Sequence, residues 1–347
     1  MERVAYFCRR LLLIVPTFIG ITLVCYAITQ FVPGGPVEQM MMRMHGIGAG
    51  SEAGGGVRGD AAISEAYRKQ LQQHYGFDKP FVVRYANWLV RDRLGLRMES
   101  YKFPNKTAWQ LIVERFPVSL VFGLTGFFLS YIVCIPLGIA KALRHGSRFD
   151  VASSVAVFVG YAIPPLAFGM VLKMLFCGTV DGLFDALPLG GYRSDNYAEM
   201  SSLAKAADLA RHMALPVLCY VIGDFAVLTL LMKHSLLDQI GQDYVRTVLA
   251  KGGTVRRAVW GHAVRNSLIP IVTGLGGILM VMFAGSVIIE QVFEIPGMGL
   301  LSLEALVGRD YAVFMGILSV TSLLGLIGNV LSDFCYVLVD PRIDFVR

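Results

Sequence analysis

The sequence contains few charged residues, and it lacks the local patterns of common catalytic and cofactor sites. Charged residues make up only 16% of its 347 residues, whereas soluble domains carry about a quarter. No GxxxxGK[ST] phosphate loop is present, which excludes ATP binding of that kind by this chain, and GxSxG and HExxH patterns are also missing. The six cysteines form no CxxC pair and the histidines are scattered. We therefore expect no disulfide framework, no metal site and no cofactor on this chain.

What the sequence has in excess is apolar residues in long runs. Hydrophobic residues make up 55% of the chain, and a helix needs about 20 residues to cross a bilayer. A basic start before an apolar run is typical of a signal peptide, but the first run is too long and is followed by Pro33-Gly34-Gly35-Pro36, so we expect a retained helix. The sequence predicts an all-α membrane protein with six transmembrane helices, at residues 11–32, 118–140, 151–177, 214–232, 267–289 and 311–339.

The placement of basic residues predicts the orientation of these helices. Loops 141–150 and 233–266 are rich in lysine and arginine, whereas loops 178–213 and 290–310 carry more acidic than basic residues. Because short basic loops remain in the cytoplasm, we expect both basic loops and both termini there. The formal net charge of +6 is then a consequence of topology, and we expect no nucleic-acid partner.

Three parts follow from this topology. Residues 1–32 form an N-terminal segment with the first transmembrane helix, residues 33–116 form a long extracytoplasmic insertion, and residues 117–347 form a core with five further helices. The insertion begins with a glycine-rich stretch and continues with aromatic residues at helical spacing, among them Tyr85 and Trp88. We expect these aromatic side chains to pack against other parts of the protein.

The cytoplasmic loop 233–266 is longer than a connection between two transmembrane helices requires. Apolar residues recur there at intervals of three and four on both sides of Gly252-Gly253. This pattern predicts two short amphipathic helices separated by a glycine break. Their apolar faces either pack on the ends of the transmembrane helices or bind a partner, and a simple hairpin on the membrane surface explains the periodicity equally well.

This loop resembles the EAA loop of binding-protein-dependent ABC importer permeases of the dipeptide and oligopeptide family. The matching residues are Tyr244, Val245, Arg246, Thr247, Ala250, Lys251, Gly252, His262, Arg265, Asn266, Leu268 and Pro270. The resemblance implies that the loop is a coupling helix that sits in a groove of a separate ATPase subunit. Val248 and Leu249 depart from the alanine and arginine that are usual in the family. The residues that this implies for ATPase coupling are Tyr244, Arg246, Thr247, Ala250, Lys251, Gly252, His262, Arg265 and Asn266.

Other segments are similar to the same family. They include the segment EQVFEIPGMGLLSLEALVGRDY from Glu290 to Tyr311 and the ending DPRIDF at 340–345. Details such as Ser147-Arg148-Phe149-Asp150 most resemble the Yej-type permease, a subgroup associated with oligopeptides and with microcin C. The resemblance implies a gate, or a contact with the binding protein, in the extracytoplasmic segment, for which a plain turn is the alternative. The residues expected there are Pro296, Gly297, Gly299, Arg309 and Asp310.

The resemblance also implies an assembly in the bacterial inner membrane. This chain would pair with a second, homologous permease subunit, with two ATPase subunits that carry ATP and Mg, and with a periplasmic peptide-binding protein. Transport would proceed by alternating access within membrane lipid. Small and polar residues within apolar runs are our candidates for lining the pathway, namely Tyr161, Pro164, Pro165, Thr273 and Gly277.

A different class of transporter is the main alternative. An ion-coupled secondary transporter buries ionisable residues in the membrane and contains broken helices in two repeats. Asp224 and Asp333 are the candidate relay groups, and Pro164-Pro165 interrupts a predicted helix, but no internal repeat is evident. A channel or a respiratory-chain subunit is a further alternative, for which no suitable histidine pair is found.

Overall fold

The computed structural model describes residues 2–31, 79–178, 185–274 and 285–339. The chain divides into two compact units. The first unit comprises Met1–Leu12, Arg115–Leu301 and Leu324–Arg347, and the second comprises Leu13–Glu114 and Ser302–Leu323. Across the described ranges the regular structure is helical, with isolated β-bridges at Glu99–Thr107 and Cys177–Asp185.

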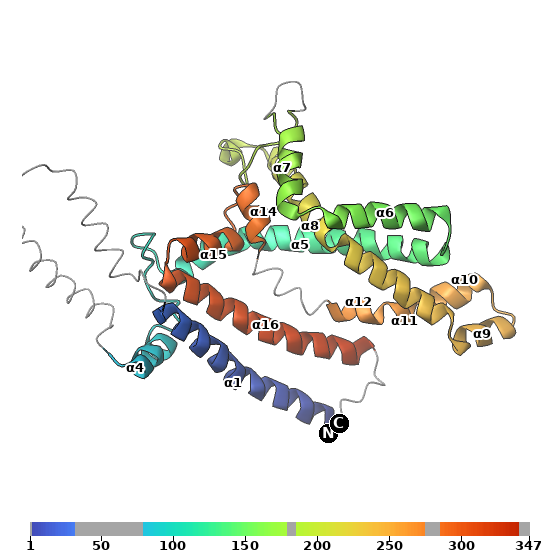
Figure 1. Ribbon diagram of the computed structural model, residues 1–347, viewed down its shortest axis with the longest axis horizontal. Coiled ribbons are helices and arrows are strands. Elements are labelled where there is room, and N and C mark those ends of the chain that lie inside the picture. The colour runs from blue at the N-terminus through green and yellow to red at the C-terminus, as the bar shows by residue number, and fades with distance from the viewer. Residues whose placement is uncertain (1, 32–78, 179–184, 275–284, 340–347) are drawn as a thin grey trace, which may run out of the picture. The chain divides into compact units, whose positions relative to one another are not determined.

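Figure 1 labels the main helices along the chain. The longer helices are α1 (Glu2–Phe31), α5 (Ala108–Leu143), α6 (Arg148–Ala162), α7 (Pro165–Phe176), α8 (Ser202–Ile240), α15 (Met298–Val307) and α16 (Tyr311–Val339). The shorter helices are α4 (Phe81–Ala86), η1 (Asn87–Arg91), η2 (Tyr197–Glu199), α9 (Asp243–Ala250), α10 (Val255–Ala258), η3 (Val259–Ala263), α11 (Val264–Ser267), α12 (Ile269–Thr273) and α14 (Val287–Val292).

Several helices are long and apolar enough to cross a membrane. Three of them qualify alone, at Ala5–Thr29, Ala108–Leu143 and Tyr311–Cys335, and counting each bent helix pair as one span raises the number to five among the described residues. These five correspond to five of the predicted spans. The remaining one, at 267–289, includes residues 275–284, which lie outside the described residues. Six spans and the orientation of the termini therefore stay predictions.

The predicted span at 151–177 differs most from expectation. It is two helices, α6 and α7, whose axes differ by 96°. Pro164 has an extended backbone with ψ of 134°, and Pro165 occupies the first turn of α7. Because proline removes a backbone donor and pushes the preceding residue out of helical conformation, two consecutive prolines end one helix and start another.

Two helices begin earlier than hydropathy predicts. Helix α5 begins at Ala108, inside the predicted insertion, because Thr107 and Gln110 form reciprocal hydrogen bonds: each backbone N–H donates to the other side chain. Helix α8 begins at Ser202, within the predicted polar loop, where the Ser201 hydroxyl accepts a hydrogen bond from the Ala204 N–H. Both boundaries are set by capping residues, which a hydropathy profile does not detect.

An aromatic core lies in the second unit. Tyr85 and Trp88 are buried with their ring centroids 5.7 Å apart, and both contact Tyr26 of α1. The Tyr85 hydroxyl lies 2.9 Å from that of Thr22, and Met315 of α16 belongs to the same core. The prediction that the aromatic residues of 79–116 pack within the protein is confirmed for Tyr85 and Trp88.

Candidate functional site

The predicted pair of amphipathic helices is confirmed. Helix α9 ends at Ala250, and a second helical stretch runs through α10, η3 and α11 from Val255 to Ser267. Gly252 lies between them with φ of 82°, a conformation that a residue with a side chain rarely adopts. The Thr254 hydroxyl caps the second stretch by accepting a hydrogen bond from the Arg257 N–H. We call residues 243–267 the coupling segment.

The inner face of the coupling segment packs on the ends of α5 and α8 (Figure 1). Its buried side chains form one apolar cluster with Met232 and Leu236, which are both fully buried on α8. The Ser235 hydroxyl also donates a hydrogen bond to the Ser267 carbonyl at 2.9 Å. Burial of this face stabilises the segment by roughly 1.5 kcal/mol or more for each large apolar side chain. The buried members contributed by the segment are Val245, Ala258, Val259, Ala263 and Val264.

The outer face of the segment combines positive charge with exposed apolar side chains. Val255 is 66% exposed, Trp260 is 54% exposed and Leu249 is 40% exposed. Tryptophan and arginine are over-represented at protein interfaces, and isolated basic patches attract acidic partners. We call this face the docking surface. Its basic members are Arg246, Lys251, Arg256, Arg257 and Arg265.

The two departures from the family pattern fall on different faces. Val248 is half-buried against the apolar cluster, and a side chain at Gly253 would come within 2.7 Å of it. Leu249 lies on the docking surface. The valine therefore lies in the internal packing, whereas the leucine adds apolar area to the exposed face.

The predicted coupling residues divide in the same way. Tyr244 is half-buried, and its hydroxyl donates a hydrogen bond to Gln239 of α8 at 2.8 Å. Asn266 is also half-buried. The hydrogen bond of Tyr244 therefore holds the segment on its own chain. The members that are exposed to a partner are Arg246, Thr247, Ala250, Lys251, Gly252, His262 and Arg265.

A buried carboxylate organises the predicted extracytoplasmic gate. Glu290 is only 2% exposed, and its carboxylate accepts hydrogen bonds from the Leu300 N–H at 2.7 Å and the Ser119 hydroxyl at 3.0 Å. Leu300 lies in the first turn of α15, where a negative charge is stabilised by the helix dipole. Burial raises the pKa of Glu290, while the hydrogen bonds from Leu300 and Ser119 oppose this by favouring the carboxylate. Sequence analysis did not select Glu290 as a site residue, although an ionisable group at the edge of an apolar run was the available signal.

Glycines make room for this carboxylate. A side chain at Gly297 would lie 2.5 Å from the Glu290 carboxyl group, and one at Gly285 would lie 2.2 Å from it. A side chain at Gly299 would meet the backbone nitrogen of Val287 at 2.7 Å. Gly297 and Gly299 are buried and Pro296 is half-buried. The two predicted gate glycines therefore hold the turn around Glu290, and contact with a partner at this turn stays a prediction.

Ser119 links α5 to this turn, and its removal tests the arrangement. Its hydroxyl donates to Glu290 and accepts a hydrogen bond from the Met298 N–H at 2.7 Å. We expect Ser119→Ala to lower the free energy of unfolding by about 2 kcal/mol, because both buried partners lose a hydrogen bond. Thermal unfolding of the purified protein in detergent measures this. The exposed residue Ser202 provides the control, and equal effects of Ser119→Ala and Ser202→Ala would contradict the prediction.

Arg309 and Asp310 are adjacent in sequence, but one is exposed and the other is buried. Arg309 is exposed with φ of 53°, and Asp310 is 1% exposed. The Asp310 carboxylate accepts hydrogen bonds from the Ser100 hydroxyl at 2.5 Å and the Lys102 N–H at 3.2 Å. Asp310 therefore joins the start of α16 to residues 100–102 within the second unit, and Arg309 is the exposed member of this predicted pair.

The predicted pathway residues are only partly described. Tyr161 is 55% exposed, and Pro164 and Pro165 are exposed at the break between α6 and α7. Thr273 ends α12, and its side chain is outside the described part of the chain, as is the whole of Gly277. Whether these residues line a pathway stays a prediction.

Comparison with known proteins finds relatives that are all components of membrane transport systems. Residues 134–345 match the family described as "Binding-protein-dependent transport system inner membrane component". The chain is 40% identical to the "Inner membrane ABC transporter permease protein YejB" of Escherichia coli O157:H7, over 98% of this chain and 99% of that protein. It is 37% identical to the "Peptidoglycan transport system permease protein YejB" of Agrobacterium fabrum, over 99% of both chains.

A dipeptide system supplies a more distant relative. The chain is 32% identical to the "Dipeptide transport system permease protein DppB" of Escherichia coli K12, over 96% of this chain and 97% of that protein. The family description and the several apolar spans both indicate a multi-pass protein of the inner membrane. The chain therefore belongs to the family of inner-membrane permease components of binding-protein-dependent transport systems, and its relatives include permeases of the Yej type.

Proposed function

We propose that this chain is the transmembrane permease subunit of an ATP-driven importer for oligopeptides or peptide-like compounds such as microcin C. The observation that carries the proposal is the two-sided coupling segment, whose apolar face packs on α5 and α8 and whose other face is basic and exposed. A segment built in this way passes force from a docked partner to the helices behind it. The names of the relatives, which include oligopeptide and dipeptide permeases, support a peptide substrate.

The proposed assembly has the parts that such an importer needs. A second, homologous permease subunit forms a heterodimer with this chain in the lipid bilayer. Two ATPase subunits, which carry ATP and Mg, bind the docking surface, and a periplasmic peptide-binding protein delivers substrate at the other side. ATP binding closes the ATPase subunits and moves the coupling segment, which opens the pathway outward. The ATPase activity resides on the partner subunits. A variant of this chain that loses function would therefore leave these subunits hydrolysing ATP without peptide uptake.

An ion-coupled carrier is less well supported. Asp333, one of the two candidate relay groups, forms an ion pair with Arg10 at 2.5 Å. The side chain of Asp224 lies outside the described residues. The relatives are permease components of ATP-driven systems by name, and this favours ATP as the source of energy.

Gly252→Asp tests the coupling segment. The substitution forces a side chain onto a backbone with positive φ and adds a negative charge to a basic surface. We expect peptide uptake per ATP hydrolysed to fall roughly tenfold in proteoliposomes that contain the complete transporter. Membrane insertion should be unaffected.

Gly191→Asp provides the matched control, because Gly191 has a similar φ of 86° and lies outside the coupling segment. If peptide uptake per ATP hydrolysed were normal in Gly252→Asp, the coupling segment would have no part in the mechanism. Uptake that continues without the ATPase subunits and stops when the proton gradient is dissipated would instead establish the ion-coupled carrier. Asp224→Asn or Asp333→Asn would then abolish uptake.

A further inference from the structure

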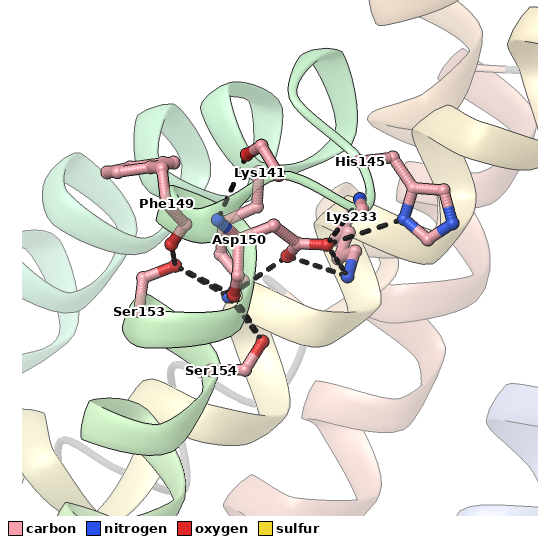
Figure 2. Close-up of polar contacts among 9 residues, drawn as sticks. Lys141, His145, Phe149, Asp150, Ser153, Ser154 and Lys233 are labelled. Carbon is pink, nitrogen blue, oxygen red and sulfur yellow. Dashed lines mark hydrogen bonds and ion pairs between the residues drawn. The ribbon is translucent and has the colours of Figure 1, made fainter.

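A buried cluster of charges lies beside the coupling segment and has no part in the docking surface. Asp150 is 4% exposed, and both of its carboxylate oxygens accept hydrogen bonds from the Lys233 ammonium at 2.8 Å. The Lys141 ammonium is fully buried and lies 3.4 Å from the same carboxylate. Figure 2 shows Asp150 between the two lysines. We call Lys141, Asp150 and Lys233 the charged cluster.

Every proton of the Lys141 ammonium has an acceptor. The ammonium donates to the Asp150 carbonyl at 3.0 Å and to the hydroxyls of Ser153 and Ser154 at 2.8 and 2.7 Å (Figure 2). The Gly146 N–H donates to the Asp150 carboxylate at 3.2 Å. A buried polar network that is satisfied in this way holds its members in one arrangement.

The charged cluster joins three helices, α5, α6 and α8. Lys141 lies in the last turn of α5, Asp150 lies in the first turn of α6, and Lys233 lies about two turns before the end of α8. Lys141 is 9 residues from Asp150 in sequence and Lys233 is 83 residues from it, so the cluster ties the α5–α6 hairpin to a distant helix. Both predicted cytoplasmic loops, 141–150 and 233–266, thus meet at this point.

The same part of α8 carries the coupling segment. Met232 precedes Lys233 and is fully buried in the apolar cluster that holds the coupling segment. A side chain at Gly138 of α5 would lie 2.6 Å from Met232, so α5 and α8 approach closely there. Adjacent residues of α8 therefore contact the coupling segment and the α5–α6 hairpin.

Stability alone does not account for buried charges at this position. Removing charges from water is costly, and apolar residues of similar size often replace a buried ion pair without loss of stability. Loss of one member is different, because the remaining charge is left uncompensated in the interior. The ion pair of Asp150 and Lys233 holds α6 and α8 together only while both charges are present. This fits a role in transmitting movement between the two helices.

We propose that Asp150 and Lys233 are positioning residues that make the α5–α6 hairpin move with α8 when the coupling segment moves. This inference rests on the proposed function and adds a route within the chain: the docked partner moves the coupling segment, α8 follows through Met232 and Leu236, and the charged cluster carries the α5–α6 hairpin with it. Without the cluster, α8 moves alone and the pathway does not open fully.

Paired substitutions separate this role from a structural one. Asp150→Asn and Lys233→Met each break the ion pair, and the double variant removes one charge of each sign, so the net charge of the cluster is unchanged. We expect both single variants to lower the Tm and to reduce peptide uptake per ATP hydrolysed by roughly tenfold in the complete transporter in proteoliposomes. The double variant should recover part of the Tm, because Lys141 keeps its three hydrogen-bond acceptors but lacks the Asp150 charge, and it should retain the tenfold loss.

An exposed ion pair elsewhere in the chain provides the control for these variants. The exposed ion pair between Lys106, which precedes α5, and Glu114 of α5 serves as the matched control, and Lys106→Met with Glu114→Gln should leave coupling unchanged. Recovery of uptake per ATP together with the Tm in the double variant would show that the cluster only stabilises the fold. If wild-type uptake required no ATP hydrolysis, the proposed function itself would fail, which is a distinguishable result.

A distance measurement tests the proposal directly, first with the cluster intact and then with the cluster broken. Spin labels are placed at the exposed residues Val151 of α6 and Asp238 of α8, with Cys8, Cys25 and Cys335 replaced by serine. We expect the same interlabel distance in the nucleotide-free and vanadate-trapped transporter, and a shift between these states when Asp150→Asn is added. A shift with the cluster intact would overturn the proposal.

Discussion

Gly299→Ala is expected to lower the free energy of unfolding by about 3 kcal/mol, because the added methyl group has no space to enter. It would meet the backbone of Ser286 and Val287 at 2.7–3.0 Å, and backbone atoms do not rotate away as a flexible side chain does. The Gly299 turn also presents the Leu300 N–H to the buried Glu290 carboxylate. Thermal and denaturant unfolding of the protein in detergent measures the loss.

Gly297→Ala and Gly20→Ala complete the comparison. We expect Gly297→Ala to be destabilising too, because its methyl group would displace the Glu290 carboxyl group. Gly20 lies within α1 with nothing near its Cβ position, so alanine there should be neutral or should stabilise the helix by up to about 1 kcal/mol. Equal stability of Gly299→Ala and Gly20→Ala would show that the turn is open and that the carboxylate is not enclosed.

Asp310→Ala is expected to cost about 3 kcal/mol, since it removes a helix cap and two further hydrogen bonds from a buried carboxylate. The Asp310 carboxylate caps α16 by accepting a hydrogen bond from the Val313 N–H at 3.3 Å, and it also binds Ser100 and the Lys102 N–H. Combining Asp310→Ala with Ser100→Ala should cost less than the sum of the two single effects, because the side chains share one hydrogen bond. Equilibrium unfolding of the three variants measures this coupling.

Asp243→Ala is the control for this effect. Asp243 likewise lies at the start of a helix, α9, but its side chain is 98% exposed. We expect a change within about 0.5 kcal/mol, as for most surface substitutions. If Asp310→Ala were equally mild, residues 100–102 would not depend on this carboxylate for their attachment to α16.

The coupling segment was predictable because its signals are local. Apolar residues at intervals of three and four define the buried face of α9, and the break falls at Gly252, which has the positive φ that glycine permits. Local signals were also available for the start of α5 in Thr107 and Gln110, and for the 96° bend in Pro164-Pro165. Hydropathy averages over such single residues, so it placed the five stretches that the described residues test on helices and misplaced the helix ends.

The contacts around buried charges were not predictable in the same way. Lys233 and Asp150 are 83 residues apart, and Ser119 and Glu290 are 171 residues apart. Nothing in the local pattern at either position indicates its partner, because the pairing depends on how the helices pack. Positive charge in loops 141–150 and 233–266 was interpreted as a topology signal, whereas the structure buries one lysine from the edge of each loop.

The ion pair between Arg10 and Asp333 has a consequence for how the protein is made. These residues are separated by 323 positions, and Phe7 contacts Phe334 at the same place with ring centroids 6.1 Å apart. Since a ribosome adds about 5–20 residues per second, Asp333 is synthesised on the order of tens of seconds after Arg10. Throughout this interval Arg10 and Phe7 lack these two partners, which both belong to α16. Closure of this contact therefore requires that α16 has been synthesised, and a chain that is interrupted before α16 leaves Arg10 without this ion pair.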